Sequence, residues 1–199
     1  YTPEDGDEKR HDPEGTALEK EEDMIAHGAG EDAHVRLARL CVESFVKTGR
    51  PARLPDDLPR ELTGRRAAVF VTLHKGGRLR GCIGTINPAR ASVAEEILHN
   101  AVSACSQDPR FPPVRADELP ELEYSVAVLG ATEDIASPDE LDGKRYGVIV
   151  SCNGRRGLLL PDIDGVDTPE EQIAIARQKA GISPREIVKL QRFEVIRHV

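Results

Sequence analysis

The sequence lacks any long apolar run. No stretch of the 199-residue chain approaches the roughly 18 consecutive apolar residues that a membrane-spanning helix needs. Apolar residues make up 39% of the chain and charged residues 31%, which is the usual balance of a water-soluble globular protein. We therefore expect a cytoplasmic protein with no membrane partner.

The sequence also lacks the paired spacings of local metal and redox motifs. Its four cysteines form no Cys-x-x-Cys pair, and its six histidines show no His-Glu-x-x-His spacing. We expect reduced thiols, no metal site built from a local motif, and no cofactor. The cysteines are Cys41, Cys82, Cys105 and Cys152.

Most of the chain has no excess of positive charge. The net charge is −8, but residues 1–32 alone carry 12 acidic and 3 basic side chains, which leaves 23 acidic and 24 basic in the remainder, a balance of +1. This balance gives no electrostatic case for nucleic-acid binding. Residues 1–30 are rich in Glu, Asp, Gly and Pro, and they predict an acidic linker or arm ahead of one domain over residues 31–199.

Hydrophobic periodicity and turn residues predict a mixed chain of helices and strands. Helical spacing covers residues 31–48, 88–106 and 168–181. Strand patterns cover residues 67–74, 78–85, 122–129, 147–152, 156–160 and 193–199. Gly76-Gly77 and Asn153-Gly154 are expected to close two hairpins. The second hairpin is apolar on both strands, so we expect it at the centre of a sheet that is covered on both faces.

One short motif combines reactive chemistry with missing side chains. Cys82 lies between Gly81 and Gly84, two residues after Arg80. A nearby cation lowers the pKa of a thiol, and glycines let a ligand approach the backbone, so the motif indicates a reactive or ligand-facing site. The same residues also fit a packed strand in which only glycine has room and the thiol is buried.

The register of the first hairpin would separate these two interpretations. A two-residue turn places Val71 opposite Cys82, among apolar neighbours. A three-residue turn instead pairs Phe70 with Cys82 and Thr72 with Arg80, on a more polar face. The sequence leaves both registers open.

Several motifs in order carry a family resemblance. They are Leu79-Arg80-Gly81-Cys82-Ile83-Gly84, Asp108-Pro109-Arg110-Phe111, Gly154-Arg155-Arg156-Gly157-Leu158-Leu159-Leu160-Pro161 and Lys179-Ala180-Gly181. Over residues 33–199 the chain resembles the AMMECR-type domain family. The resemblance implies an α/β (α+β) fold of two packed lobes, each with a mostly antiparallel sheet flanked by helices, and a cleft near the glycine–cysteine motif.

The resemblance also implies partners. Bacterial and archaeal members are similar to protein A of the AmmeMemoRadiSam system, which is encoded with, or fused to, a Memo-type domain and accompanied by a radical-SAM protein. Residues 1–30 would then be a linker between fused domains. A homodimer is a further candidate assembly.

Carried onto this sequence, the resemblance gives a candidate site of Arg80, Gly81, Cys82, Gly84, Asp108, Arg110 and Arg156. In an enzyme, Cys82 would be the nucleophile, Arg80 would lower its pKa, and His99 or His74 would be the base. Arg110 and Arg156 would hold a small anion such as a carboxylate or phosphate. Structural alternatives exist for each: Asp108 and Arg110 can form a local ion pair, and His99 and Arg156 can be solvated surface residues.

Three functions stay open. The favoured one is a binding or accessory protein that presents its cleft to a small molecule or modified peptide, because glycines and arginines suffice for binding and no complete catalytic set can be assembled. The alternatives are a cysteine-dependent enzyme and an interaction module without a small-molecule site. A phosphate loop and a Rossmann-type site are disfavoured, since Gly81 and Gly84 fall on a predicted strand.

Overall fold

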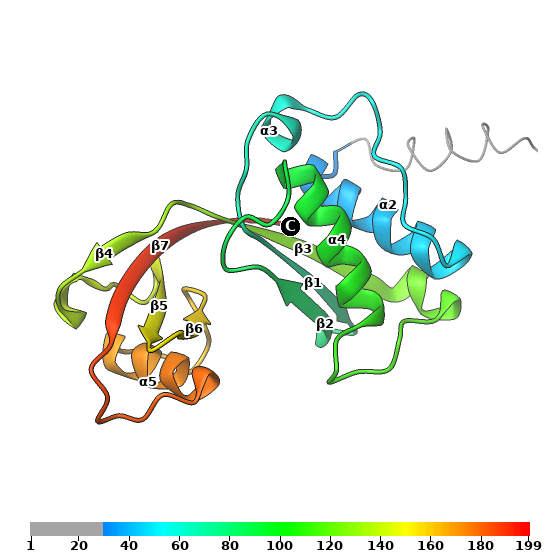
Figure 1. The fold of residues 1–199 in the computed structure, drawn as a ribbon. Coiled ribbons are helices and arrows are strands. Elements are labelled where there is room, and N and C mark those ends of the chain that lie inside the picture. The colour runs from blue at the N-terminus through cyan, green and yellow to red at the C-terminus, as the bar shows by residue number, and fades with distance from the viewer. Residues whose placement is uncertain (1–29) are drawn as a thin grey trace, which may run out of the picture. The chain divides into compact units, whose positions relative to one another are not determined.

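The computed structural model describes residues 30–199 (Figure 1). The predicted acidic arm, residues 1–30, lies outside the described residues except for Gly30. Asp32–Val199 forms one structural unit. None of the helices described over residues 30–199 is long and apolar enough to cross a membrane.

One curled antiparallel sheet runs through this unit in the order β2-β1-β3-β7-β5-β6, with β4 added on β7. The strands are β1 (Val69–Lys75), β2 (Arg78–Gly84), β3 (Leu122–Leu129), β4 (Glu133–Ile135), β5 (Tyr146–Cys152), β6 (Arg155–Leu159) and β7 (Lys189–His198). The curved strand β7, red in Figure 1, pairs with β5 up to Glu194 and with β3 from Val195 onward. The two predicted lobes therefore share a single sheet. The first lobe contains β1, β2 and β3 with α2 to α4, and the second contains β4, β5 and β6 with α5.

The helices flank this sheet. They are α2 (Ala33–Thr48), α3 (Arg60–Thr63), α4 (Val93–Ser106) and α5 (Pro169–Ala180), with short 3-10 turns η1 (Ala116–Glu121) and η2 (Pro138–Glu140). Asp32 caps the first turn of α2, and Gly49 ends it with φ 71°. Thr168 and Gly181 do the same for α5. Both helices confirm the sequence prediction.

The first lobe packs α2 and α4 on one face of β1 and β3 (Figure 1). Val71, Leu73, Ile97 and Val126 are fully buried in this layer, and so is Cys41, as the helical periodicity predicts. Full burial of one such aliphatic side chain contributes roughly 1.5–3 kcal/mol. This core fixes the strands that carry the glycine–cysteine motif.

The predicted start of the second helix at Pro88 is wrong. Helix α4 begins at Val93, with Ser92 as its cap. The reason is Glu96, which is only 1% exposed. Its carboxylate accepts hydrogen bonds from the backbone N–H groups of Ala89 and Arg90 and from the Thr85 hydroxyl. These bonds fold the segment after β2 back over the first turn of α4.

The predicted central position of the second hairpin is also wrong. Strand β6 is an edge of the sheet. Both faces of the hairpin are nevertheless covered, as predicted. One face packs on α5 through Val150 and Ala176. On the other face, Ile149 and Leu158 pack in a cluster with Phe193 and with Ala68 of the first lobe, close to β1.

Candidate functional site

A β-bulge in the first hairpin decides the surroundings of Cys82. The turn contains two residues, Gly76-Gly77, with φ angles of 58° and 74°. The register then shifts between Leu73 and His74, so that Cys82 lies opposite Thr72. Neither of the two registers considered from the sequence is correct. The bulge gives the thiol a polar neighbour, with the Cys82 Sγ 3.2 Å from the Thr72 Oγ1.

The two glycines of the motif serve close packing. A Cβ on Gly81 would overlap the carbonyl oxygen of Ala104 in α4, and a Cβ on Gly84 would overlap the ring of Phe70. Glycine is therefore needed at both positions for the lobe to pack. Because successive residues of a strand face opposite sides, Cys82 points away from α4, and its side chain is half-buried.

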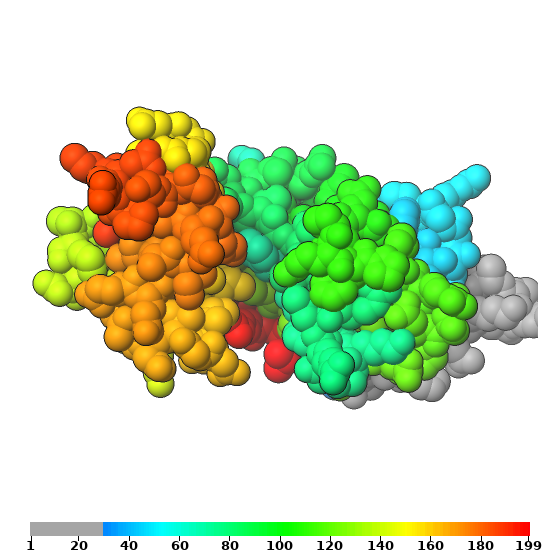
Figure 2. Space-filling model, turned by 90° about the horizontal axis from the view of Figure 1, so that it is seen from below, coloured from blue at the N-terminus to red at the C-terminus, as the bar shows by residue number. Residues whose placement is uncertain are grey.

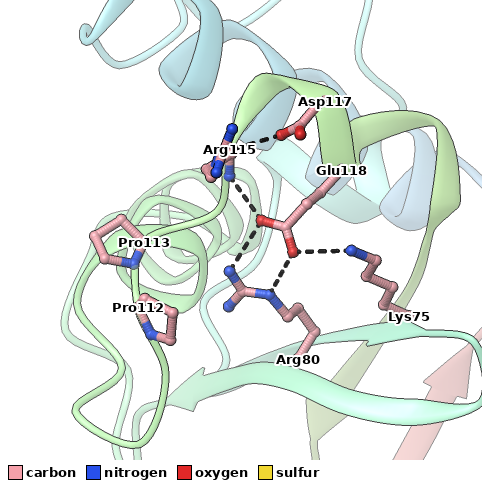
Figure 3. A pocket seen from close by; sticks show the side chains of 7 residues that line it. All are labelled: Lys75, Arg80, Pro112, Pro113, Arg115, Asp117 and Glu118. Atoms are coloured by element: carbon pink, nitrogen blue, oxygen red, sulfur yellow. Dashed lines mark hydrogen bonds and ion pairs between the residues drawn. The ribbon is translucent and has the colours of Figure 1, made fainter.

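Arg80 lies in an ion-pair cluster with Glu118. Its Nε and Nη2 lie 3.0 and 3.1 Å from the two Glu118 oxygens, and the Lys75 Nζ lies 3.2 Å from one of them (Figure 3). This cluster lowers the pKa of Glu118 to about 2, with Arg80 as the main cause. The ion-pair cluster lines a hollow of about 320 Å³, and Cys82 is not among the residues that line this hollow. The bulge has re-aimed Arg80 toward η1.

Asp108 and Arg110 hold the outer edge of β2 at Cys82. Asp108 is 4% exposed, and its Oδ2 accepts a hydrogen bond from the Cys82 N–H at 3.0 Å. Arg110 grips the same carboxylate through Nε at 3.0 Å and Nη2 at 2.8 Å, and its Nη2 also donates to the Cys82 carbonyl at 3.3 Å. Both backbone groups of Cys82 are thus satisfied, as a neighbouring strand would satisfy them. The Arg110 guanidinium holds the pKa of Asp108 far below its usual range.

Lys179 is a further charged residue, contributed by α5 of the second lobe. It is exposed as a residue, and its ammonium group donates to the Leu158 carbonyl at 2.8 Å. Burial of the ammonium lowers the pKa of Lys179. The charge of a Cys82 thiolate opposes that shift, and the charge of Arg110 adds to it. Lys179 therefore lies within electrostatic reach of both groups.

A groove runs between the two lobes. Figure 2 shows it between the orange surface around α5 and the green surface of α4 and the segment that follows. Cys82 and Arg110 belong to the first lobe and Lys179 to the second. The two lobes meet in an apolar cluster in which Phe70 packs with Leu158.

The structure therefore brings together only part of the predicted site. Cys82, Asp108 and Arg110 are adjacent, whereas His99 is exposed on α4 and Arg156 is exposed on β6. Within residues 30–199, neither of these last two makes a hydrogen bond or ion pair with the others. Lys179 is the residue that the sequence analysis missed. Its motif was part of the family resemblance, but nothing in its sequence neighbourhood indicated a partner 97 positions away in the chain.

Comparisons with known proteins identify the family of the chain. The family model described as AMMECR1 matches residues 35–198. A protein of Thermotoga maritima is 49% identical over 171 residues, covering 85% of this chain and 98% of that protein. A protein of Clostridium acetobutylicum is 45% identical and covers 84% of this chain, but the match spans only 36% of its own length.

A solved structure shares the fold. The crystal structure of an uncharacterized protein from Pyrococcus horikoshii matches with a TM-score of 0.77 and 34% identity, over 82% of this chain and 88% of the other. The segment that the family model matches includes Cys82, Asp108, Arg110 and Lys179. The chain belongs to the AMMECR1 family.

Proposed function

We propose that the protein binds a small anionic ligand, a carboxylate or a phosphate, beside the Cys82 thiol in the groove between its lobes. The observation that carries this proposal is that Arg110 holds the Cys82 backbone, while Lys179, whose ammonium is held by Leu158, interacts electrostatically with both Cys82 and Arg110. The two cations come from segments separated along the chain, and the charge of Arg110 acts on Lys179. Two cations held close together repel each other, so an anion between them is stabilised.

The donors that remain at the groove suit an anion. Arg110 uses Nε and Nη2 in its bonds to Asp108 and Cys82, which leaves both Nη1–H groups for a ligand. Lys179 uses one of its three N–H groups on Leu158 and retains two. Guanidinium and ammonium donors are the groups that hold carboxylates and phosphates in proteins.

The site is also preorganised. The Asp108 carboxylate is buried and fixes the Arg110 guanidinium through two parallel bonds, so a ligand does not need to order that side chain. Asp108 also compensates the charge of Arg110. Lys179 therefore supplies the uncompensated positive charge of the groove, and its removal should weaken anion binding most.

The test compares two alkylating reagents of similar size. Iodoacetate carries the proposed charge, whereas iodoacetamide is neutral. The ratio of their rates at Cys82, measured by mass spectrometry, is expected to exceed the ratio for free N-acetylcysteine several-fold. Lys179→Met should bring the ratio back toward that of the free thiol, because it removes the ammonium and keeps the length of the side chain.

Cys152 provides a control inside the same chain. Its Sγ lies 3.8 Å from the Arg155 Nη2, but Arg155 is paired with Glu186. Its rate ratio should therefore stay near that of the free thiol, and Lys179→Met should leave it unchanged. Equal ratios at Cys82 and Cys152 would contradict the proposal.

A second candidate function is a cysteine-dependent enzyme. The observation in its favour is that burial lowers the pKa of Lys179 and that its charge interacts with Cys82, so the neutral amine of Lys179 can act as the base in place of the exposed His99. The pH dependence of the iodoacetamide rate at Cys82 tests it. Lys179→Met should slow the reaction around neutral pH, because it removes the group that would take up the thiol proton; a rate unchanged across the pH range would reject the base role.

We also propose that the protein acts in the cytoplasm with a Memo-type and a radical-SAM protein. Support comes from the family resemblance and from the C. acetobutylicum relative, in which the matched region is only part of a longer chain. Co-expression with each candidate partner and size-exclusion chromatography with light scattering would test this assembly and also report a homodimer. Elution of every component alone would count against the partnership.

A further inference from the structure

Two histidines and an aspartate meet where α2 begins and β7 ends. The His34 Nδ1 lies 3.1 Å from Asp32 Oδ1, and the His198 Nδ1 lies 2.8 Å from Asp32 Oδ2. The two imidazole rings stack with centroids 3.6 Å apart and an angle of 16° between their planes. The Nδ1 atoms of the two rings thus each face a different oxygen of the Asp32 carboxylate.

The fold, rather than a local motif, builds this cluster. Asp32 is fixed because its Oδ1 caps α2 by accepting the His34 N–H at 2.8 Å. His198 is held at the end of β7, where its backbone pairs with Val126 of β3. Its 164-residue separation from His34 explains why a search for ligand spacing along the sequence does not find it.

The donor set is that of a transition-metal site. One ligand atom from each of the three residues lies within 4.8 Å of the others. Two imidazole nitrogens and one carboxylate oxygen suit zinc(II) and iron(II), whereas magnesium and calcium prefer oxygen ligands alone. We propose that Asp32, His34 and His198 bind one divalent ion of the zinc(II) and iron(II) class.

Ion binding requires the ring stack to open. An imidazole nitrogen coordinates a metal in the plane of its ring, and two parallel rings cannot both direct their nitrogens to one ion. The side chain of His34 is 5% exposed and is fixed by Asp32, whereas that of His198 is 17% exposed. His198 is therefore the ligand that turns, while Asp32 and His34 form the fixed half of the site.

The proposed site shares no residue with the groove at Cys82, so the two can be tested independently. Cobalt(II) is a suitable probe, because its visible absorption reports tetrahedral nitrogen and oxygen ligands. Chelator-treated full-length chain is titrated with cobalt(II) and then with zinc(II). One cobalt(II) per chain should bind, and zinc(II) should displace it. Asp32→Asn should weaken cobalt(II) binding at least tenfold while keeping the helix cap, because asparagine caps as well as aspartate.

Three further variants complete the test. His198→Ala should weaken binding to a similar extent, and its circular dichroism spectrum checks that the variant is folded. His99→Ala removes an exposed histidine, and the double variant Cys82→Ser, Cys152→Ser removes the two half-buried thiols; both should bind cobalt(II) as tightly as the unaltered chain. Absence of cobalt(II) binding would overturn the proposal, and so would binding that is lost with the two thiols but kept in Asp32→Asn.

Discussion

The two lobes contain the same small unit, a hairpin followed by a helix, and use it differently. In both, a two-residue turn closes the hairpin with positive φ angles, at Gly76-Gly77 and at Asn153-Gly154. The second strand then carries one glycine against a carbonyl of the helix: Gly81 against Ala104 in the first lobe and Gly157 against Ala176 in the second. Both second strands, β2 and β6, are edges of the sheet.

The difference lies in how each edge is protected. The edge of β2 is closed by a buried carboxylate and a guanidinium, Asp108 and Arg110, which occupy both backbone groups of Cys82. The edge of β6 receives one donor, the ammonium of Lys179. Exposed edges invite pairing with other chains, and charged side chains are a common defence. The same charged side chains are the ones assigned to the proposed anion site.

The largest effect is expected from filling the space above the two glycines. Gly81→Ala forces a methyl group into the Ala104 carbonyl, and such overpacking costs about 3 kcal/mol. Gly157→Ala meets an even closer carbonyl, that of Ala176, but α5 is the one long helix that residues 30–199 place in this lobe, and we expect it to move outward. Urea denaturation should show the greater loss of stability for Gly81→Ala, and hydrogen exchange should show loosening confined to α5 for Gly157→Ala. Equal losses of global stability in the two variants would show that both lobes respond in the same way to the added methyl group.

A smaller effect is expected at the protected edge of β2. Asp108→Asn keeps one acceptor for the Cys82 N–H but loses the charge that holds Arg110, at a cost of about 2 kcal/mol. Lys179→Met, on the other edge, exchanges one hydrogen bond for an apolar stem and should cost less than about 1 kcal/mol. Thermal denaturation of both variants measures the contrast. A greater loss for Lys179→Met would reverse the ranking of the two edges.

The next effect depends on pH. The pKa of Glu118 falls to about 2 in the folded chain from an ordinary value of 4.5, so its stabilising contribution is complete above about pH 4.5 and is lost as the pH falls toward 2. Glu118→Gln should cost about 1–2 kcal/mol at neutral pH and flatten the acid branch of the stability curve. Glu186, which pairs with Arg155 in the second lobe, is more exposed, and Glu186→Gln should change that branch less. Denaturant midpoints from pH 2 to 7 provide the measurement.

The smallest effect is expected at the two exposed residues of the predicted site. Arg156→Gln and His99→Gln should each change stability by less than about 0.5 kcal/mol, because neither side chain is buried. Neither should alter the rate of Cys82 alkylation by iodoacetamide. A tenfold slower reaction in His99→Gln would restore that histidine as a candidate base.

Sequence reasoning succeeded where the determining chemistry is local. Gly76-Gly77 and Asn153-Gly154 specify their turns, and Thr168 with Gly181 bounds α5, because each requirement is met within a few residues. It failed where distant groups compete. The buried Glu96 delays the start of α4, and its three donors cannot be inferred from its own helix.

The candidate site divides in the same way. The motif around Cys82 and the pair of Asp108 and Arg110 could be identified from the sequence. The bulge that turns Arg80 to Glu118 could not, because the hairpin sequence fits more than one register. The role of Lys179 also depends on the curl of the whole sheet, which brings β6 and α5 to the place where Cys82 and Arg110 act on its charge.

That curl has a mechanical consequence. The strand β7 is continuous from Lys189 to His198, and it changes partner between Glu194 and Val195. Each wall of the groove is thus anchored to one half of the same ribbon of backbone. A ligand that draws the two walls together must increase the bend of β7 where it changes partner. A substitution that stiffens the β7 backbone there would therefore set the width of the groove without touching the ligand.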